Sequence, residues 1–111
     1  MVGSLVVALV LVAILVVPPM RARSEAKHSS LEVQVDNFTF APETLTVPVN
    51  STVTWVNKDD LPHVIASDDG LFKSQALDTD DKYSYKFSKP GTYPYYCSVH
   101  PKMVGKIVVH R

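Results

Sequence analysis

Three side chains near the end of this sequence combine donor types that soft and borderline metal ions prefer. Cys97, His100 and Met103 place a thiol, an imidazole and a thioether three residues apart. Three residues span at most about 10 Å when extended, so a tight loop can bring all three donors to one ion. Thiolate, imidazole and thioether together favour copper over hard cations.

A fourth donor lies earlier in the chain. His63 follows Pro62 at the start of a predicted strand. Because the loops at one end of a β-sandwich converge, we expect His63 to meet the loop that contains Cys97. Two histidines and one cysteine with a weak axial methionine form the ligand set of blue-copper electron-transfer sites. The sequence therefore predicts a copper site made of His63, Cys97, His100 and Met103.

Each of these residues also has an ordinary structural interpretation. A single cysteine in a sandwich is most often an inert buried thiol, and a methionine often fills a gap in a core. The joint pattern, with three donors at ligand spacing between two predicted strands, favours the metal site. His28 and His110 lie near the ends of the segment 27–111 without neighbours of ligand type, so we assign them no metal role.

Composition limits the classes of function. The chain has 111 residues, enough for one domain, with 11 basic and 11 acidic side chains. A net charge of zero gives no electrostatic reason to expect a nucleic-acid partner. The single cysteine excludes an internal disulfide and the two-cysteine redox and zinc motifs. A domain of this size is marginal on hydrophobic burial alone, so a bound metal would add stability.

The N-terminal segment is typical of an export signal. Residues 2–17 carry no charge and are followed by Pro18-Pro19, where a helix stops. Their length is at the lower limit for a membrane span, and Ser24-Glu25-Ala26 offers small residues for cleavage after Ala26. We predict a signal peptide over 1–26 and a copper-binding domain over 27–111.

An uncleaved anchor is the alternative for this segment. Residues 1–4 contain no Lys or Arg, whereas Arg21 and Arg23 follow the apolar run, which is the wrong side for export. Membrane attachment then depends on residues 2–17 remaining as an anchor. A start upstream of Met1 is a further alternative.

The rest of the chain alternates between apolar and polar residues like a series of short β-strands. The alternating runs are 31–36, 45–49, 52–57, 82–87, 91–96 and 104–109. Pro48 suggests an edge strand, and Asn50 stands where a turn favours a positive φ. Residues 66–80 are the least regular and are expected to hold one helical turn or a loop. About seven strands at this spacing predict an antiparallel β-sandwich.

With these residues in view, the chain resembles the small cupredoxins. The two-residue gap between His100 and Met103 is similar to that of the amicyanins, whereas plastocyanins and pseudoazurins generally use a longer gap. The resemblance covers residues 31–110 and implies an all-β, Greek-key sandwich of seven to eight strands. It rests on four segments of the sequence: 37–49, 52–57, Pro62-His63 and 91–105.

The resemblance also implies a function. The protein would be a blue copper (type 1) protein that carries single electrons between redox proteins by cycling one ion between Cu(II) and Cu(I). His63, Cys97 and His100 would be the equatorial ligands and Met103 the axial one. His100 would lie nearest to solvent, in an apolar rim of Leu61, Pro62, Pro101 and Val104.

Partners and location follow from the same resemblance. The partner would be a c-type cytochrome, a dehydrogenase or an oxidase that docks near His100. The protein would be a monomer without enzymatic activity, periplasmic or otherwise exported from a bacterium.

A copper chaperone or storage protein is the competing function. Such proteins use several Met and His donors for Cu(I), whereas residues 27–111 contain only Met103 as a thioether donor.

One departure from the family pattern bears on the site. Cupredoxins often carry Asn directly after the first histidine, where it ties the ligand loops together, and Val64 stands there in this chain. This replacement leaves the reduction potential and the rigidity of the site open.

Overall fold

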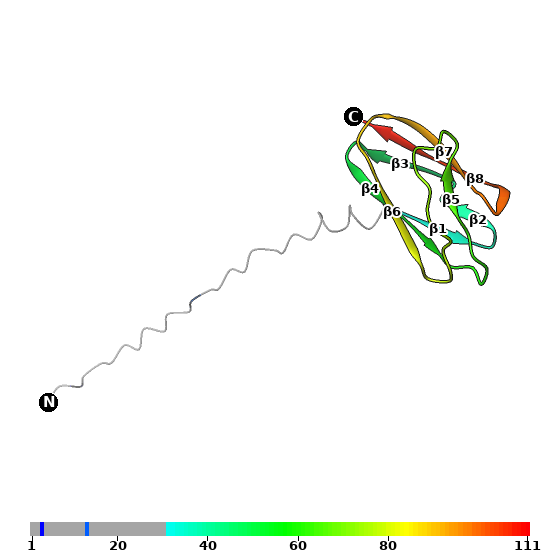
Figure 1. Ribbon diagram of the computed structural model, residues 1–111. Helices are drawn as coiled ribbons and strands as arrows, with labels where there is room; N and C mark the ends of the chain where they lie inside the picture. Colours follow the sequence, from blue (N-terminus) through cyan, green and yellow to red (C-terminus); the bar gives the residue numbers. More distant parts are fainter. Residues whose placement is uncertain (1–2, 4–12, 14–30) are drawn as a thin grey trace.

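Two four-stranded β-sheets form the computed structural model, which describes residues 31–111 and the isolated positions 3 and 13 (Figure 1). The strand order of the first sheet is β2-β1-β4-β6, with β1 Glu32–Asp36, β2 Thr39–Ala41, β4 Ser51–Asn57 and β6 Lys82–Phe87. The second sheet has the order β3-β8-β7-β5, with β3 Thr44–Pro48, β5 Ile65–Ser67, β7 Gly91–Cys97 and β8 His100–His110. The prediction of an all-β sandwich is confirmed. The predicted signal peptide, the alternative anchor and the cleavage point after Ala26 lie outside the described residues.

The apolar alternation determines which face of each strand is buried. In β1, Val33 and Val35 are fully buried, and the residues between and beside them are exposed. All six predicted strands form, although β8 begins at His100 and is longer than expected. Strand β2 was not predicted, because three residues are too few to show an alternation. The strand expected to start at His63 corresponds to β5, which begins two residues later at Ile65.

The prediction that all strands pair antiparallel is wrong. Strand β1 pairs in parallel with β4, and β3 pairs in parallel with β8, while the other pairs are antiparallel. The chain changes sheets between β2 and β3 and again between β3 and β4. After these two crossings β4 lies beside β1 in the first sheet and runs in the same direction.

The predictions for Pro48 and Asn50 are confirmed, and the structure decides between the two alternatives for segment 66–80. Pro48 lies in the edge strand β3, and Asn50 has a φ of 72°. No helix forms within residues 31–111, so segment 66–80 is a loop held by β5 and two isolated bridges. Within the described residues, no helix is long and apolar enough to cross a membrane.

The core between the sheets is aromatic and extends to the predicted metal donors. The ring of Trp55 lies 5.3 Å from that of Tyr95 and 5.6 Å from that of Phe72, measured between centroids. Cys97 and Met103 belong to the same buried cluster. Cys97, His100 and Met103 therefore stand on the paired strands β7 and β8, whereas His63 lies between β4 and β5 and is held by an isolated bridge to Leu77.

Gly105 allows β7 and β8 to pack closely beside this end. Gly105 pairs with Tyr95 across the two strands, and both residues are buried. A Cβ atom at position 105 would lie 2.6 Å from the Cζ atom and from the hydroxyl oxygen of Tyr95. The tyrosine ring occupies the space that any larger residue at position 105 would need.

Gly105→Ala is therefore expected to lower the free energy of unfolding by about 1–3 kcal/mol, because Tyr95 must leave its packed position. Urea unfolding followed by tryptophan fluorescence measures the change. Lys106→Ala, at the exposed neighbouring position, is the control and should change stability by less than about 0.5 kcal/mol. Equal stability of the two variants would contradict this view of the packing.

Candidate metal centre

A shift in the pairing of β7 with β8 brings two of the predicted donors together. Tyr96 pairs with Val104, but the next residue, Cys97, pairs with His100. The three residues 101–103 have no partner on β7 and form a bulge in β8. Side chains directly opposite each other in a ladder have Cβ atoms about 5 Å apart. The bulge therefore places the thiol and an imidazole side by side.

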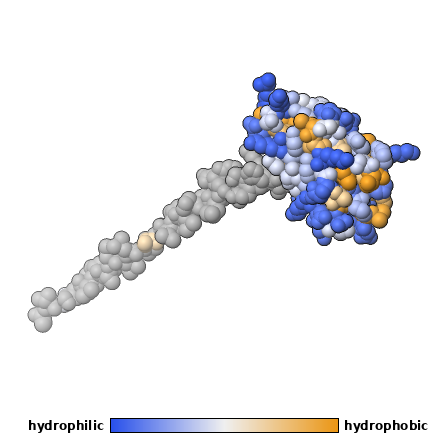
Figure 2. All heavy atoms as spheres, viewed as in Figure 1, coloured by the Kyte–Doolittle hydropathy of each residue, from blue (hydrophilic) through white to orange (hydrophobic). Residues whose placement is uncertain are grey.

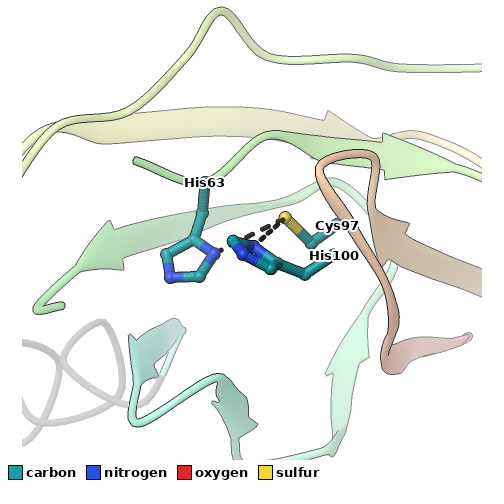
Figure 3. Close-up of side chains that lie close together, drawn as sticks. All are labelled: His63, Cys97 and His100. Carbon is teal, nitrogen blue, oxygen red and sulfur yellow. Dashed lines mark hydrogen bonds between the residues drawn. The ribbon is translucent and has the colours of Figure 1, made fainter. Parts of the chain in front are cut away.

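Three predicted donors meet at this end of the sandwich (Figure 3). The Sγ atom of Cys97 lies 3.5 Å from Nδ1 of His63 and 3.9 Å from Nδ1 of His100. The ligand atoms of the three residues all lie within 4.8 Å of one another. Cys97 and His63 are fully buried, whereas His100 is half-buried.

The spacing of these atoms fits one transition-metal ion. Bonds of about 2.1 Å to nitrogen and 2.3 Å to sulfur, in a trigonal arrangement, separate neighbouring donors by about 3.8 Å. The two sulfur–nitrogen distances of 3.5 and 3.9 Å lie on either side of this value. Met103 is 6% exposed and lines the same surface hollow as His100. His63, Cys97 and His100 thus form a candidate site for one copper ion, with Met103 beside it.

His63 is fixed through both its backbone and its ring. Its N–H donates to the carbonyl of Leu77 at 3.1 Å, and its carbonyl accepts from the N–H of Leu77 at 2.8 Å. The ring atom Nε2 lies 2.8 Å from Oδ2 of Asp59. A carboxylate accepts only from a protonated nitrogen, so Nε2 carries a proton in this contact, and Nδ1 is the ring nitrogen that faces Cys97.

Asp59 carries a negative charge beside this histidine. Burial raises the pKa of the Asp59 carboxyl, but hydrogen bonds from the N–H groups of Phe38 and Asn37 and from His63 outweigh it and hold the pKa below its ordinary value. The charge of Asp59 complements a metal-bound imidazole.

A buried amide shapes the loop before His63. Asn57 is fully buried and donates from Nδ2 to the carbonyls of Leu61 and Leu77, at 2.9 and 2.8 Å. Its Oδ1 accepts from the N–H of Asp59 at 2.9 Å. One side chain thus closes the turn that carries Asp59 and connects it to the residue that pairs with His63.

The backbone of Val64 connects the two ligand loops. Its N–H points at Sγ of Cys97 at 3.5 Å, and its carbonyl accepts from the N–H of Ser98 at 3.1 Å. The sequence left the rigidity of the site open because Val64 stands where the family often has Asn. Two backbone hydrogen bonds make the connection without a side-chain amide.

An open surface hollow of about 470 Å³ lies over His100, and hydrophobic residues gather on this side of the domain (Figure 2). The ring of Phe38 stands edge-on to both histidines, 5.0 Å from His100 and 5.6 Å from His63 between centroids. Of the predicted rim, Pro101 lines the hollow, and Leu61 and Val104 are exposed. The residues that line the hollow are Phe38, Val99, His100, Pro101, Lys102 and Met103.

The sequence did not single out Phe38, Asn57 or Asp59. Asp59 precedes His63 by four residues within a predicted turn, which is a weak signal for a carboxylate that orients a ligand. Phe38 follows Asn37, a residue that tolerates a positive φ, and the pair could have been predicted as a two-residue hairpin turn.

The fold and the site together define a β-sandwich metalloprotein with one buried cysteine between two histidines. A family model for the cupredoxin-like domain matches residues 5–109, and the chain belongs to this family. It is 38% identical over 95 residues to amicyanin-alpha of Methylorubrum extorquens, covering 81% of this chain and 80% of that protein. It is 39% identical over 83 residues to the chloroplastic plastocyanin of Chlamydomonas reinhardtii, covering 63% of this chain and 57% of that protein. A solved Cu(I) form of an amicyanin variant matches with a TM-score of 0.69 and 33% identity, over 72% of this chain and 81% of that chain. The predicted resemblance to cupredoxins of the amicyanin type is confirmed.

Asn57→Ala should lower the free energy of unfolding by about 2–4 kcal/mol, because it removes three hydrogen bonds made by a fully buried side chain, two to the carbonyls of Leu61 and Leu77 and one from the N–H of Asp59. Chemical denaturation of the metal-free protein measures the loss. Gln75→Ala, which shortens an exposed amide side chain, is the matched control and should be nearly neutral. An Asn57→Ala variant as stable as the control would show that the loop before His63 is held by other contacts.

Proposed function

We propose that this protein is an exported type 1 copper protein that carries single electrons between redox partner proteins. His63, Cys97 and His100 would hold the ion as main ligands, with Met103 as a weak axial ligand. The observation that carries the proposal is the buried thiol of Cys97 between two imidazole nitrogens, at 3.5 and 3.9 Å. Relatives named amicyanin and plastocyanin support the same function.

When bound, copper supplies a one-electron couple between Cu(II) and Cu(I). The protein supplies ligands that change little between the two states. Cys97 ends a paired strand and receives the N–H of Val64, and His63 is held by Leu77 and Asp59. A site built on strands rather than on a free loop keeps the reorganisation that accompanies a change of charge small.

The partner would meet the protein at the hollow over His100. Of the three donors brought together, His100 alone is not fully buried, so a protein docked there contacts a ligand side chain directly. Apolar residues around it, including Phe38, Val99 and Pro101, suit a transient contact with another redox protein. A c-type cytochrome, a dehydrogenase or an oxidase has the chemistry for this role, and the carrier itself would act as a monomer.

Burial favours a carrier over a copper chaperone or an enzyme. A chaperone must release its ion, whereas His63 and Cys97 are both fully buried. An enzyme needs an open coordination position, and Met103, which is buried and lines the same hollow as His100, would fill that position as the axial ligand. The proposal that the protein is exported to the periplasm rests on residues 1–26, which would act as a cleaved signal peptide or as an anchor.

The thiol of Cys97 should give the copper protein a strong visible absorption band from charge transfer between sulfur and Cu(II). Cys97→Ser offers a hard oxygen instead, so this band should disappear completely. Ser98→Ala, at the adjacent position, keeps the backbone bond to Val64 and should retain the band. An unchanged spectrum in Cys97→Ser would show that the ligand set is wrong.

Met103 should tune the site rather than hold it together. Met103→Leu should keep the visible band and raise the reduction potential, because loss of a donor destabilises Cu(II) more than Cu(I). Voltammetry measures the potential, and Ile107→Leu, a buried aliphatic exchange on the same strand, should leave it unchanged. Complete loss of copper from a folded Met103→Leu protein would make Met103 a primary ligand.

A further inference from the structure

One carboxylate joins two parts of the site that are distant in the sequence. Oδ2 of Asp59 accepts from Nε2 of His63 at 2.8 Å and from the N–H of Phe38 at 3.0 Å. Oδ1 accepts from the N–H of Asn37 at 2.5 Å. The side chain of Asp59 is 11% exposed, so these three donors replace most of the water it would otherwise bind.

The backbone of Asp59 is also fixed. Its N–H donates to Oδ1 of the buried Asn57, and its carbonyl accepts from the hydroxyl of Thr79 at 2.6 Å. The carboxylate is therefore presented from a rigid loop and can hold other groups in position.

The turn that Asp59 binds has an unusual conformation. Asn37 and Phe38 are the two residues between β1 and β2, with φ values of 51° and 58°. Asn tolerates this left-handed region, but a bulky aromatic residue rarely adopts it. Both N–H groups of the turn point at Asp59, and the ring of Phe38 then stands against His63 and His100.

We propose that Asp59 is a positioning residue that couples the metal site to the hollow over His100, where a partner would dock. It orients the ring of His63 for metal binding and, through the same carboxylate, holds the turn that places Phe38 over both histidines. The nature of the metal rests on the proposed function, but the coupling rests on contacts within this chain.

The coupling requires a carboxylate and not merely a side chain of this shape. Three donors converge on the two oxygens of Asp59, and Asn offers one oxygen and an NH₂ group that repels an N–H donor. Asp59→Asn keeps the shape and must lose at least one of the three bonds. Asp59→Glu is longer by one CH₂ group but keeps both acceptor oxygens.

Copper affinity tests the effect on His63. Replacement of a group that orients a ligand histidine typically costs 10–100-fold in metal affinity, and we expect a loss of about this size for Asp59→Asn in the full chain. Competition with a chelator of known affinity measures it. Asp60→Asn removes the same charge from the exposed adjacent residue and should change the affinity by less than about twofold.

Nuclear magnetic resonance of the metal-free protein tests the coupling without copper. In the wild type, the Nε2–H proton of His63 should exchange slowly, and the ring of Phe38 should shift the proton signals of His100. In Asp59→Asn, the slowly exchanging Nε2–H signal of His63 should disappear and the amide signals of Asn37 and Phe38 should move. The ring-current shift that Phe38 causes in the His100 signals should become smaller. Phe38→Leu should keep the slow proton and lose only the ring shift.

Several outcomes would overturn the proposal. Copper binding by Asp59→Asn as tight as that by Asp60→Asn would overturn it, and so would unchanged amide signals of Asn37 and Phe38 in Asp59→Asn. If Asp59→Asn does not fold, Asp59→Glu decides the question: recovery of the slow His63 proton and of most of the copper affinity supports the proposal, and their absence overturns it. A wild-type protein without the visible copper band would contradict the proposed function, whereas the metal-free measurements would still decide the role of Asp59.

Discussion

The shift in pairing between β7 and β8 is the constraint on which the site depends. A continuous ladder through Tyr96 and Val104 would pair Cys97 with Met103, because each step along one antiparallel strand is one step back along the other. The shift makes His100 the partner of Cys97 instead. It leaves Met103 in the bulge, buried and beside the hollow over His100. The spacing between His100 and Met103 in the sequence is thus set by the three-residue length of the bulge.

The second ligand loop is held against this hairpin by contacts that need no metal. His63 pairs through its backbone with the buried Leu77, and Val64 forms hydrogen bonds to both Cys97 and Ser98. Asn57 and Asp59 close the loop from the other side. The chain's own hydrogen bonds thus hold the imidazole and the thiol close together, which favours a site that changes little between two charge states.

Much of this could be predicted from the sequence because the relevant signals are local. The alternation in β1, β4 and β6 reports which faces are buried, and the spacing of Cys97, His100 and Met103 lies within one hairpin. The parallel pairing of β1 with β4 could not be predicted, since alternation says which face is buried but not which strand lies next to it. The contact of Asp59 with Asn37 and Phe38 joins residues 21 and 22 positions apart. Nothing in either segment alone indicates the other.

The most direct measurement compares backbone amide signals of the metal-free and the Cu(I)-loaded protein by nuclear magnetic resonance. A site formed by the fold predicts one ion per chain and changes confined to residues around the ligands, in segments 37–38, 57–64 and 97–103. Signals of core strand residues, such as Trp55 and Phe87, should stay where they are. Changes spread through the core, or ligand loops whose signals appear only after copper is added, would contradict this view and show that the metal builds the site.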